Sequence, residues 1–169
     1  MFVTRTTSPV RECVGAILIR GESILLGKRS AQRDFYPGVW DVFGGHIEVG
    51  ESFEQTLRRE LQEELGILPT AWKYFETLRE LDPASGAGLI CHFFVVTEWQ
   101  GMPENMQPQE HSEIEWYRIA DVAQLHLAHP EYVRLFRSAR KFLEDDEKTY
   151  SEKRSYEDLG PHSRQRTRN

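Results

Sequence analysis

The sequence predicts an α/β fold in which helices cover both faces of a mixed β-sheet. Three observations lead to this prediction. Apolar runs typical of strands occur both before residue 44 and after residue 71, a capped amphipathic helix lies between them, and a second helical stripe follows the last strand. A sheet with one apolar helix on each side buries its faces as a three-layer sandwich.

The length and composition predict one domain with one core. The chain has 169 residues, of which 39% are hydrophobic and 28% are charged. We expect residues 1–10 to be a lead-in, residues 11–143 to form the domain, and residues 144–169 to be a polar, mobile tail. Because apolar runs are short and the N-terminus lacks an apolar signal segment, the expected location is cytoplasmic, away from membranes.

The net charge narrows the expected partners, and the cysteines indicate the expected compartment. A net charge of −6 argues against a stable nucleic-acid complex, which needs a basic face. An acidic protein can still bind a small polyanion if bound metal ions supply positive charge. Cys13 and Cys91 both lie in strand-like runs, so we expect buried thiols in a reducing compartment. A monomer or a homodimer is expected.

The first strands should form a hairpin that leads to a loop and a short strand. Residues 13–19 and 23–27 are apolar runs separated by Arg20-Gly21-Glu22. Arg29 follows the second run, where it either faces water or binds phosphate through its guanidinium fork. Residues 39–43 are a predicted strand that places Trp40 and Phe43 in the core, and Gly44-Gly45 then allow close approach of a ligand to the backbone.

The central helix is predicted at Phe53–Leu65. Ser52 and Gln55 have the spacing of a capping box, and Gly66 stands where a helix commonly ends in a left-handed residue. At about 100° per residue, Glu64 falls inside the apolar stripe, between Phe53 and Leu57. A buried, unpartnered carboxylate there would be costly.

Three glutamates on this helix are better explained by cation binding than by solvation. Glu60, Glu63 and Glu64 repel one another at these spacings, and their oxygens are the hard ligands that Mg²⁺ or Mn²⁺ prefers. Arg59 lies one turn before Glu63 and could orient it. Glu51, just before the helix, could support the ligands from outside.

The second half of the chain supplies strands and two further helices. Residues 72–81 are ambiguous by period, and their aromatic residues favour a strand. Residues 88–98 and 113–117 are also predicted strands, separated by a turn-rich loop at 100–109. Residues 120–125 and 131–142 are predicted helices, of which the second should pack on the sheet.

The stretch 45–67, GHIEVGESFEQTLRRELQEELGI, matches every fixed position of the Nudix box. Sequence on both sides of the box also resembles the small antimutator branch of the Nudix hydrolases, which acts on nucleoside triphosphates. The resemblance covers roughly residues 11–130 and implies the α/β/α sandwich of that family.

The resemblance implies site roles and a Mg²⁺ cofactor, with Mn²⁺ as a substitute. The implied metal ligands are the Gly44 carbonyl, Glu60, Glu63 and Glu64. Arg29 and Gly45 are expected to contact a small nucleotide substrate, while Arg59 and Glu51 support the acids. Glu63 is the first choice for taking a proton from the attacking water, and Glu110 or Glu115 is an additional candidate acid.

The expected reaction is hydrolysis of a pyrophosphate linkage, with a nucleoside triphosphate, normal or oxidised, giving a monophosphate and a diphosphate. Two alternatives stay open. An ADP-sugar or dinucleoside polyphosphate hydrolase uses the same box, and a nucleotide-sensing domain without catalysis would usually lack some of the box acids.

Overall fold

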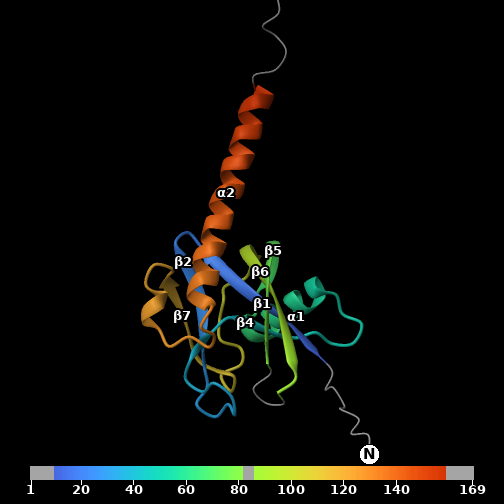
Figure 1. Cartoon of the computed structure of the whole chain (residues 1–169), viewed down its shortest axis with the longest axis vertical. Coiled ribbons are helices and arrows are strands. Elements are labelled where there is room, and N and C mark those ends of the chain that lie inside the picture. The colour runs from blue at the N-terminus through green and yellow to red at the C-terminus, as the bar shows by residue number, and fades with distance from the viewer. Residues whose placement is uncertain (1–9, 82–85, 159–169) are drawn as a thin grey trace, which may run out of the picture.

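The computed structural model describes residues 10–81 and 86–158, with side chains to residue 149. The chain forms a mixed sheet between two main helices (Figure 1). The strands are β1 (Arg11–Arg20), β2 (Ser23–Arg29), β3 (Trp40–Asp41), β4 (Phe43–His46), β5 (Leu68–Leu81), β6 (Gly88–Gln100) and β7 (His111–Arg118). The helices are α1 (Phe53–Leu65), the 3-10 turn η1 (Val122–Gln124) and α2 (Tyr132–Asp158).

The sheet is mixed because β1 runs parallel to β6, whereas its other pairings are antiparallel. The main path is β3-β2-β1-β6-β5. Strand β4 also pairs with β1, and β7 also pairs with β2. Strand β1 pairs with β2 only at its C-terminal end, through Ile19↔Ile24 and Arg20↔Ser23. The earlier part of β1, Cys13–Ala16, is therefore free to pair with β4.

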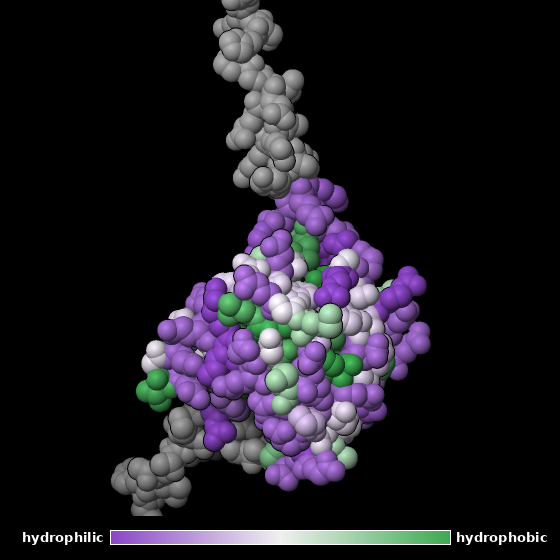
Figure 2. All heavy atoms as spheres, turned by 180° about the vertical axis from the view of Figure 1, so that it is seen from behind, coloured by the Kyte–Doolittle hydropathy of each residue, from purple (hydrophilic) through white to green (hydrophobic). Residues whose placement is uncertain are grey.

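Two hydrophobic cores lie on opposite faces of the sheet. On one face α1 buries Leu57, Leu61 and Leu65 against strand residues such as Leu18 and Phe94. On the other face α2 contributes Leu135, Phe136 and Ala139 to the second core. The three-layer α/β/α prediction is therefore confirmed. Figure 2 shows that one outer face is predominantly hydrophilic, with hydrophobic residues in small groups.

The central helix forms where its capping residues predict. The Ser52 hydroxyl accepts from the Gln55 N–H, and the Gln55 side chain accepts from the Ser52 N–H. Gly66 ends the helix in the left-handed conformation, at φ 67°. The helix prediction is confirmed at both ends.

Several boundaries differ from the sequence-based predictions. The single strand predicted at 39–43 is two short strands, because β3 pairs with β2 and β4 pairs with β1. At the break the Asp41 carboxylate accepts from the Val42 N–H. Gly44 and Gly45, which follow the predicted strand, belong to β4. The helix predicted at 120–125 is only the short 3-10 turn η1. Strand β5 begins four residues before the predicted start, and its assignment as a strand is confirmed.

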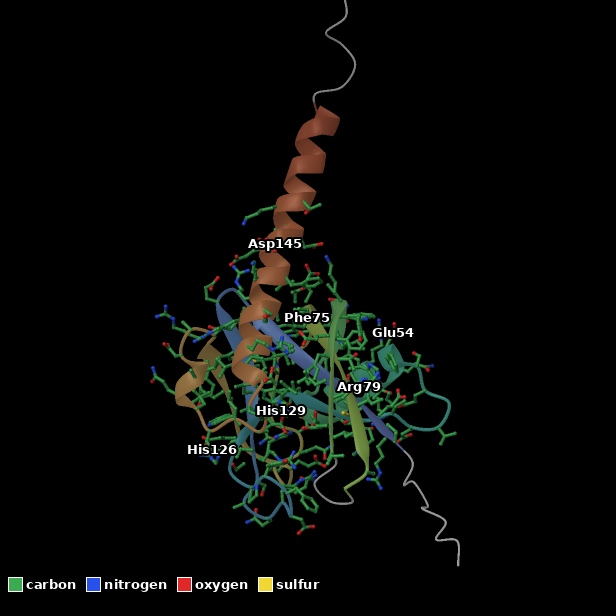
Figure 3. The ribbon with its side chains drawn as sticks, viewed as in Figure 1. Glu54, Phe75, Arg79, His126, His129 and Asp145 are labelled. Atoms are coloured by element: carbon green, nitrogen blue, oxygen red, sulfur yellow. The ribbon has the colours of Figure 1, made fainter. Side chains whose placement is uncertain are left out.

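Helix α2 is longer than the predicted helix and projects away from the sheet (Figure 1). The boundary expected at residue 143 therefore falls inside a continuous helix. Lys73 of β5 pairs with Asp146, beside the labelled Asp145 in Figure 3, which ties the helix to the sheet beyond that boundary. Residues 1–9 of the expected lead-in and 159–169 of the expected tail lie outside the described residues. No helix in the described part of the chain is long and apolar enough to cross a membrane.

Candidate active site

A cavity of about 600 Å³ opens beside β1, β4 and the start of β7. Carboxylates of α1 line one part of it. Arg29 at the end of β2, with Arg33 and two aromatic residues of the following loop, lines another. Of the predicted site residues, those that line it are Arg29, Gly44, Gly45, Arg59, Glu60, Glu64 and Glu110. Glu51, Glu63 and Glu115 do not line it.

Glu64 is the buried acid that the helical periodicity predicts. Its residue is only 4% exposed, and both carboxylate oxygens have partners. The Gly44 N–H donates to Oε2 over 2.8 Å, and Nε2 of His111 lies 2.9 Å from Oε1. Burial raises the pKa of Glu64 above its usual range, and the contacts with His111 and Gly44 oppose that rise. The side chain is thus fixed at the junction of α1, β4 and β7.

Glu60 occupies space that a glycine leaves open. A Cβ at residue 45 would overlap the Glu60 carboxylate, so Gly45 permits this acid to lie against β4. Gly44 has φ 139°, and a Cβ there would overlap the Val14 carbonyl of β1. Burial raises the pKa of Glu60, and repulsion from Glu64 and Glu63 adds to the rise. These two glycines let the strand backbone and the acids approach closely.

Arg59 of α1 forms ion pairs with one acid before the helix and two acids on it. Its guanidinium lies 2.8 Å from Glu51 Oε1, 2.8 Å from Glu60 Oε1 and 3.4 Å from Glu63 Oε2. Hydrogen bonds from Arg59 and Thr56 lower the pKa of Glu51 to about 2. One arginine thus faces three carboxylates, which leaves this group net negative before Glu64 is added.

Glu63 lies on the outer side of this group. Its side chain is 48% exposed, and it reaches the cluster only through Arg59. Glu110 lies closer to the buried acid, since ligand atoms of Glu64, Glu110 and His111 are all within 4.8 Å of one another. Glu115, by contrast, is an exposed residue of β7 away from the cavity. The structure therefore brings one of the two additional candidate acids to the site.

Arg29 is held at the end of β2 by two groups. Its guanidinium donates to the Phe35 carbonyl over 3.0 Å and pairs with Asp41 at 3.2 Å. The Tyr132 hydroxyl at the start of α2 donates to the other Asp41 oxygen over 2.8 Å. This chain of contacts fixes the guanidinium at the cavity wall, where a phosphate group can accept from it.

The residues present fit a hard divalent cation. Glu60 and Glu64 offer carboxylate oxygens beside the backbone of Gly44, and Glu110 adds a third acid nearby. Their burial and mutual repulsion are unfavourable without positive charge, and a cation would offset both.

Comparison with known proteins agrees with this geometry. The family described as NUDIX domain matches residues 9–138. The chain belongs to the Nudix family.

Its relatives include enzymes that act on nucleotide pyrophosphates. The chain is 37% identical over 117 residues to the CTP pyrophosphohydrolase of Escherichia coli, covering 69% of this chain and 82% of that one. It is 32% identical over 134 residues to the 8-oxo-dGTP diphosphatase of Haemophilus influenzae, covering 77% and 95%. The crystal structure of a MutT Nudix hydrolase from Burkholderia pseudomallei superposes with a TM-score of 0.65 at 26% identity, covering 76% and 96%. The chain is therefore a Nudix hydrolase, of a family that generally uses divalent metals.

Sequence reasoning missed His111, Asp41 and Tyr132 in this Nudix hydrolase. His111 is buried at the start of β7, and a Cβ at Gly27 would lie 2.6 Å from its Nδ1, so the glycine of β2 makes room for the ring. That pairing depends on the register between β2 and β7, which the sequence does not display. The only sequence signal for this contact was a glycine, Gly27, beside the charged end of a strand. That signal alone does not identify His111 as its partner.

Proposed function

We propose that this Nudix hydrolase cleaves the pyrophosphate linkage of a nucleoside triphosphate, normal or oxidised, to a nucleoside monophosphate and a diphosphate. The observation that carries the proposal is one cavity that joins buried acids to a fixed arginine. A triphosphate group needs both a cation site and a guanidinium partner, and the cavity supplies the residues for each. The named activities of the relatives support the same substrate class.

In this proposal Glu60, Glu64 and the Gly44 carbonyl would hold Mg²⁺, with Mn²⁺ as a substitute and with Glu63 at the outer edge. When bound, the cation would neutralise phosphate charge and lower the pKa of water. Arg29 binds and orients the phosphates, while Gly45 keeps the backbone open to them. Arg59 and Glu51 hold Glu60 and Glu63 in place.

The bond changes are those of hydrolysis. A water oxygen attacks phosphorus, the bridging P–O bond breaks towards the leaving phosphate group, and a carboxylate takes the water proton. Glu63 is the first candidate for that carboxylate and Glu110 is the second. Glu63 is exposed and linked to Arg59, whereas Glu110 lines the cavity beside Glu64. Comparing Glu63→Gln with Glu110→Gln assigns the role, because loss of the base lowers kcat far more than KM.

The test is a product screen with Mg²⁺ across nucleoside triphosphates, oxidised triphosphates, ADP-ribose and dinucleoside polyphosphates. Chromatography identifies the products directly. Glu63→Gln serves as the site variant, because its side chain is half-exposed and we expect the change to preserve the fold. Glu54→Gln, an exposed acid-to-amide change in the first turn of the same helix, is the matched control.

We expect metal-dependent turnover of triphosphates to the monophosphate, reduced in Glu63→Gln and retained in Glu54→Gln. Preferred turnover of ADP-ribose or a dinucleoside polyphosphate would replace the triphosphate assignment with the alternative hydrolase. Nucleotide binding with Mg²⁺ and no turnover of any substrate would support the sensing alternative.

A further inference from the structure

Two cysteines lie side by side on the wall of the cavity. Strands β1 and β6 are parallel, and their register places Cys13 directly opposite Cys91. Residues opposite each other in such a pair project to the same face of the sheet. Both cysteines line the cavity, and they are the only two in the chain. Both are free thiols, as predicted, and Cys13 is buried as expected, whereas Cys91 is only partly buried.

The strand spacing suits a bond between them. Neighbouring strands lie about 4.8 Å apart, and disulfides join Cα atoms that are roughly 4.4–6.8 Å apart. The two side chains lie next to each other in the sheet, and Cys91 is half-buried. Reaction between them thus requires side-chain rotation and little backbone movement.

The neighbours of the pair give the two sulfurs different roles. The adjacent Cys13 and burial raise the pKa of Cys91 well above its usual range, so Cys91 is held as a thiol at neutral pH and suits the second step of an oxidation, not the first. Within the described residues, the pair does not belong to any group of three side chains placed to hold a metal ion. Two adjacent thiols at a cavity can be oxidised to a disulfide.

We propose that Cys13 and Cys91 form an oxidation site, in which a hydroperoxide converts the pair to a disulfide that hinders nucleotide binding. Cys13, as its thiolate, attacks a peroxide oxygen, the O–O bond breaks, and a sulfenic acid forms with release of water or an alcohol. The second thiol attacks the sulfenic sulfur and releases water, so two thiols and one hydroperoxide give one disulfide.

The effect on binding follows from the position of the pair. The same cavity carries Asp41, which pairs with Arg29, the proposed phosphate-binding residue. Closing the disulfide draws the two sulfurs to about 2.05 Å apart and so changes the shape of the cavity wall. A loss of fit equivalent to one hydrogen bond corresponds to a rise in KM of about two- to tenfold. This part of the inference rests on the proposed function, whereas disulfide formation does not.

The experiment treats the full chain with hydrogen peroxide and reads intact mass, free thiols and nucleotide hydrolysis. Cys13→Ser and Cys91→Ser are the matched variants, since each keeps one thiol and cannot close the bond within the chain. Treated and untreated samples of each protein are compared, and a thiol reductant is then added.

The expected result is a monomer that loses two hydrogen atoms and both free thiols, with KM raised and restored by the reductant. Each single variant should show equal KM before and after treatment. A wild-type protein that gains oxygen atoms at one sulfur, or that links only between chains, would overturn the oxidation site. An internal disulfide with unchanged KM would overturn its effect on binding. The mass measurement stands even if the chain hydrolyses no nucleotide or a serine variant fails to fold.

Discussion

Glycine at residue 45 and glutamate at residue 60 share one small volume. A methyl group at residue 45 would overlap the Glu60 carboxylate, which is the mobile end of a side chain. Gly45→Ala should therefore displace that acid and preserve the fold. We expect kcat/KM for the hydrolysed nucleotide to fall about 10–100-fold, the usual effect of disturbing the support of a metal ligand.

Gly88→Ala is the control for this substitution, because its Cβ would meet Val10 at an ordinary 3.4 Å. Kinetics and circular dichroism on both variants check the prediction. Equal activity in Gly45→Ala and Gly88→Ala would show that the position of Glu60 does not limit the reaction.

The same residue scale shows what the sequence could and could not predict. Helical periodicity placed Glu64 in the apolar stripe, because that inference needs only local spacing. Its partner His111 lies 47 residues further along the chain, and the two meet only after β2 and β7 have paired. Spacing likewise grouped Glu63 with the other acids, while the structure leaves it half-exposed. Glu110 and Glu115 were indistinguishable by sequence, because their difference depends on where β7 begins and which way each residue points.

At the scale of elements, local signals predicted α1 better than the strands around it. The ends of α1 are fixed by Ser52, Gln55 and Gly66, which lie at or next to those ends in the sequence. The split between β3 and β4 depends on pairing with β2 and β1, which is not local. Helix α2 extends beyond its predicted end at residue 142, because the prediction rested only on its apolar stripe. Pairs such as Lys73 with Asp146 and Arg140 with Glu144 accompany the polar continuation.

The helix cap gives a stability prediction. Ser52→Ala removes the side-chain acceptor of the Gln55 N–H, which should destabilise the fold by about 1 kcal/mol. Gln62→Ala, at an exposed site in the last turn of the same helix, should change stability little. Urea unfolding of both variants measures the difference. Equal midpoints would mean that the capping box contributes nothing measurable.

The loop before α1 gives a pH prediction. Hydrogen bonds from Arg59 and Thr56 lower the pKa of Glu51 from 4.5 to about 2, so its ionised form is favoured in the folded state. The associated stability is present above pH 4.5 and is lost as the pH falls towards 2. Glu60 and Glu64 have raised pKa values and act in the opposite direction.

As the pH falls from 4.5 towards 2, the free energy of unfolding should therefore decrease less in Glu51→Gln than in the unaltered protein. Urea midpoints across this pH range, with a chelator present throughout, separate the contribution of Glu51 from metal binding. An unchanged pH slope in Glu51→Gln would show that the Arg59 contact is not maintained in solution.

At the scale of the whole molecule, the acid cluster connects elements that are far apart in the sequence. Glu64 lies on α1, Gly44 on β4 and His111 on β7, while Tyr132 of α2 reaches the same cavity through Asp41. Figure 3 shows His129 beside the start of α2, where the second helical layer meets the sheet. Neutralising the cluster should thus stabilise the entire fold.

Mg²⁺ binding supplies the corresponding measurement. A ligand that binds only the folded state adds about 2.7 kcal/mol at 100 times its Kd. We therefore expect Mg²⁺ to raise the melting temperature of the unaltered protein in a concentration-dependent manner. The rise should be much smaller in Glu60→Gln, which removes one proposed ligand, and undiminished in Glu54→Gln, which changes an exposed acid outside the cavity. Because no nucleotide is present, the melting curves test the cation site independently of the reaction. If Glu60→Gln and the unaltered protein respond equally to Mg²⁺, the cation binds elsewhere on this acidic chain and the proposed ligand set is wrong.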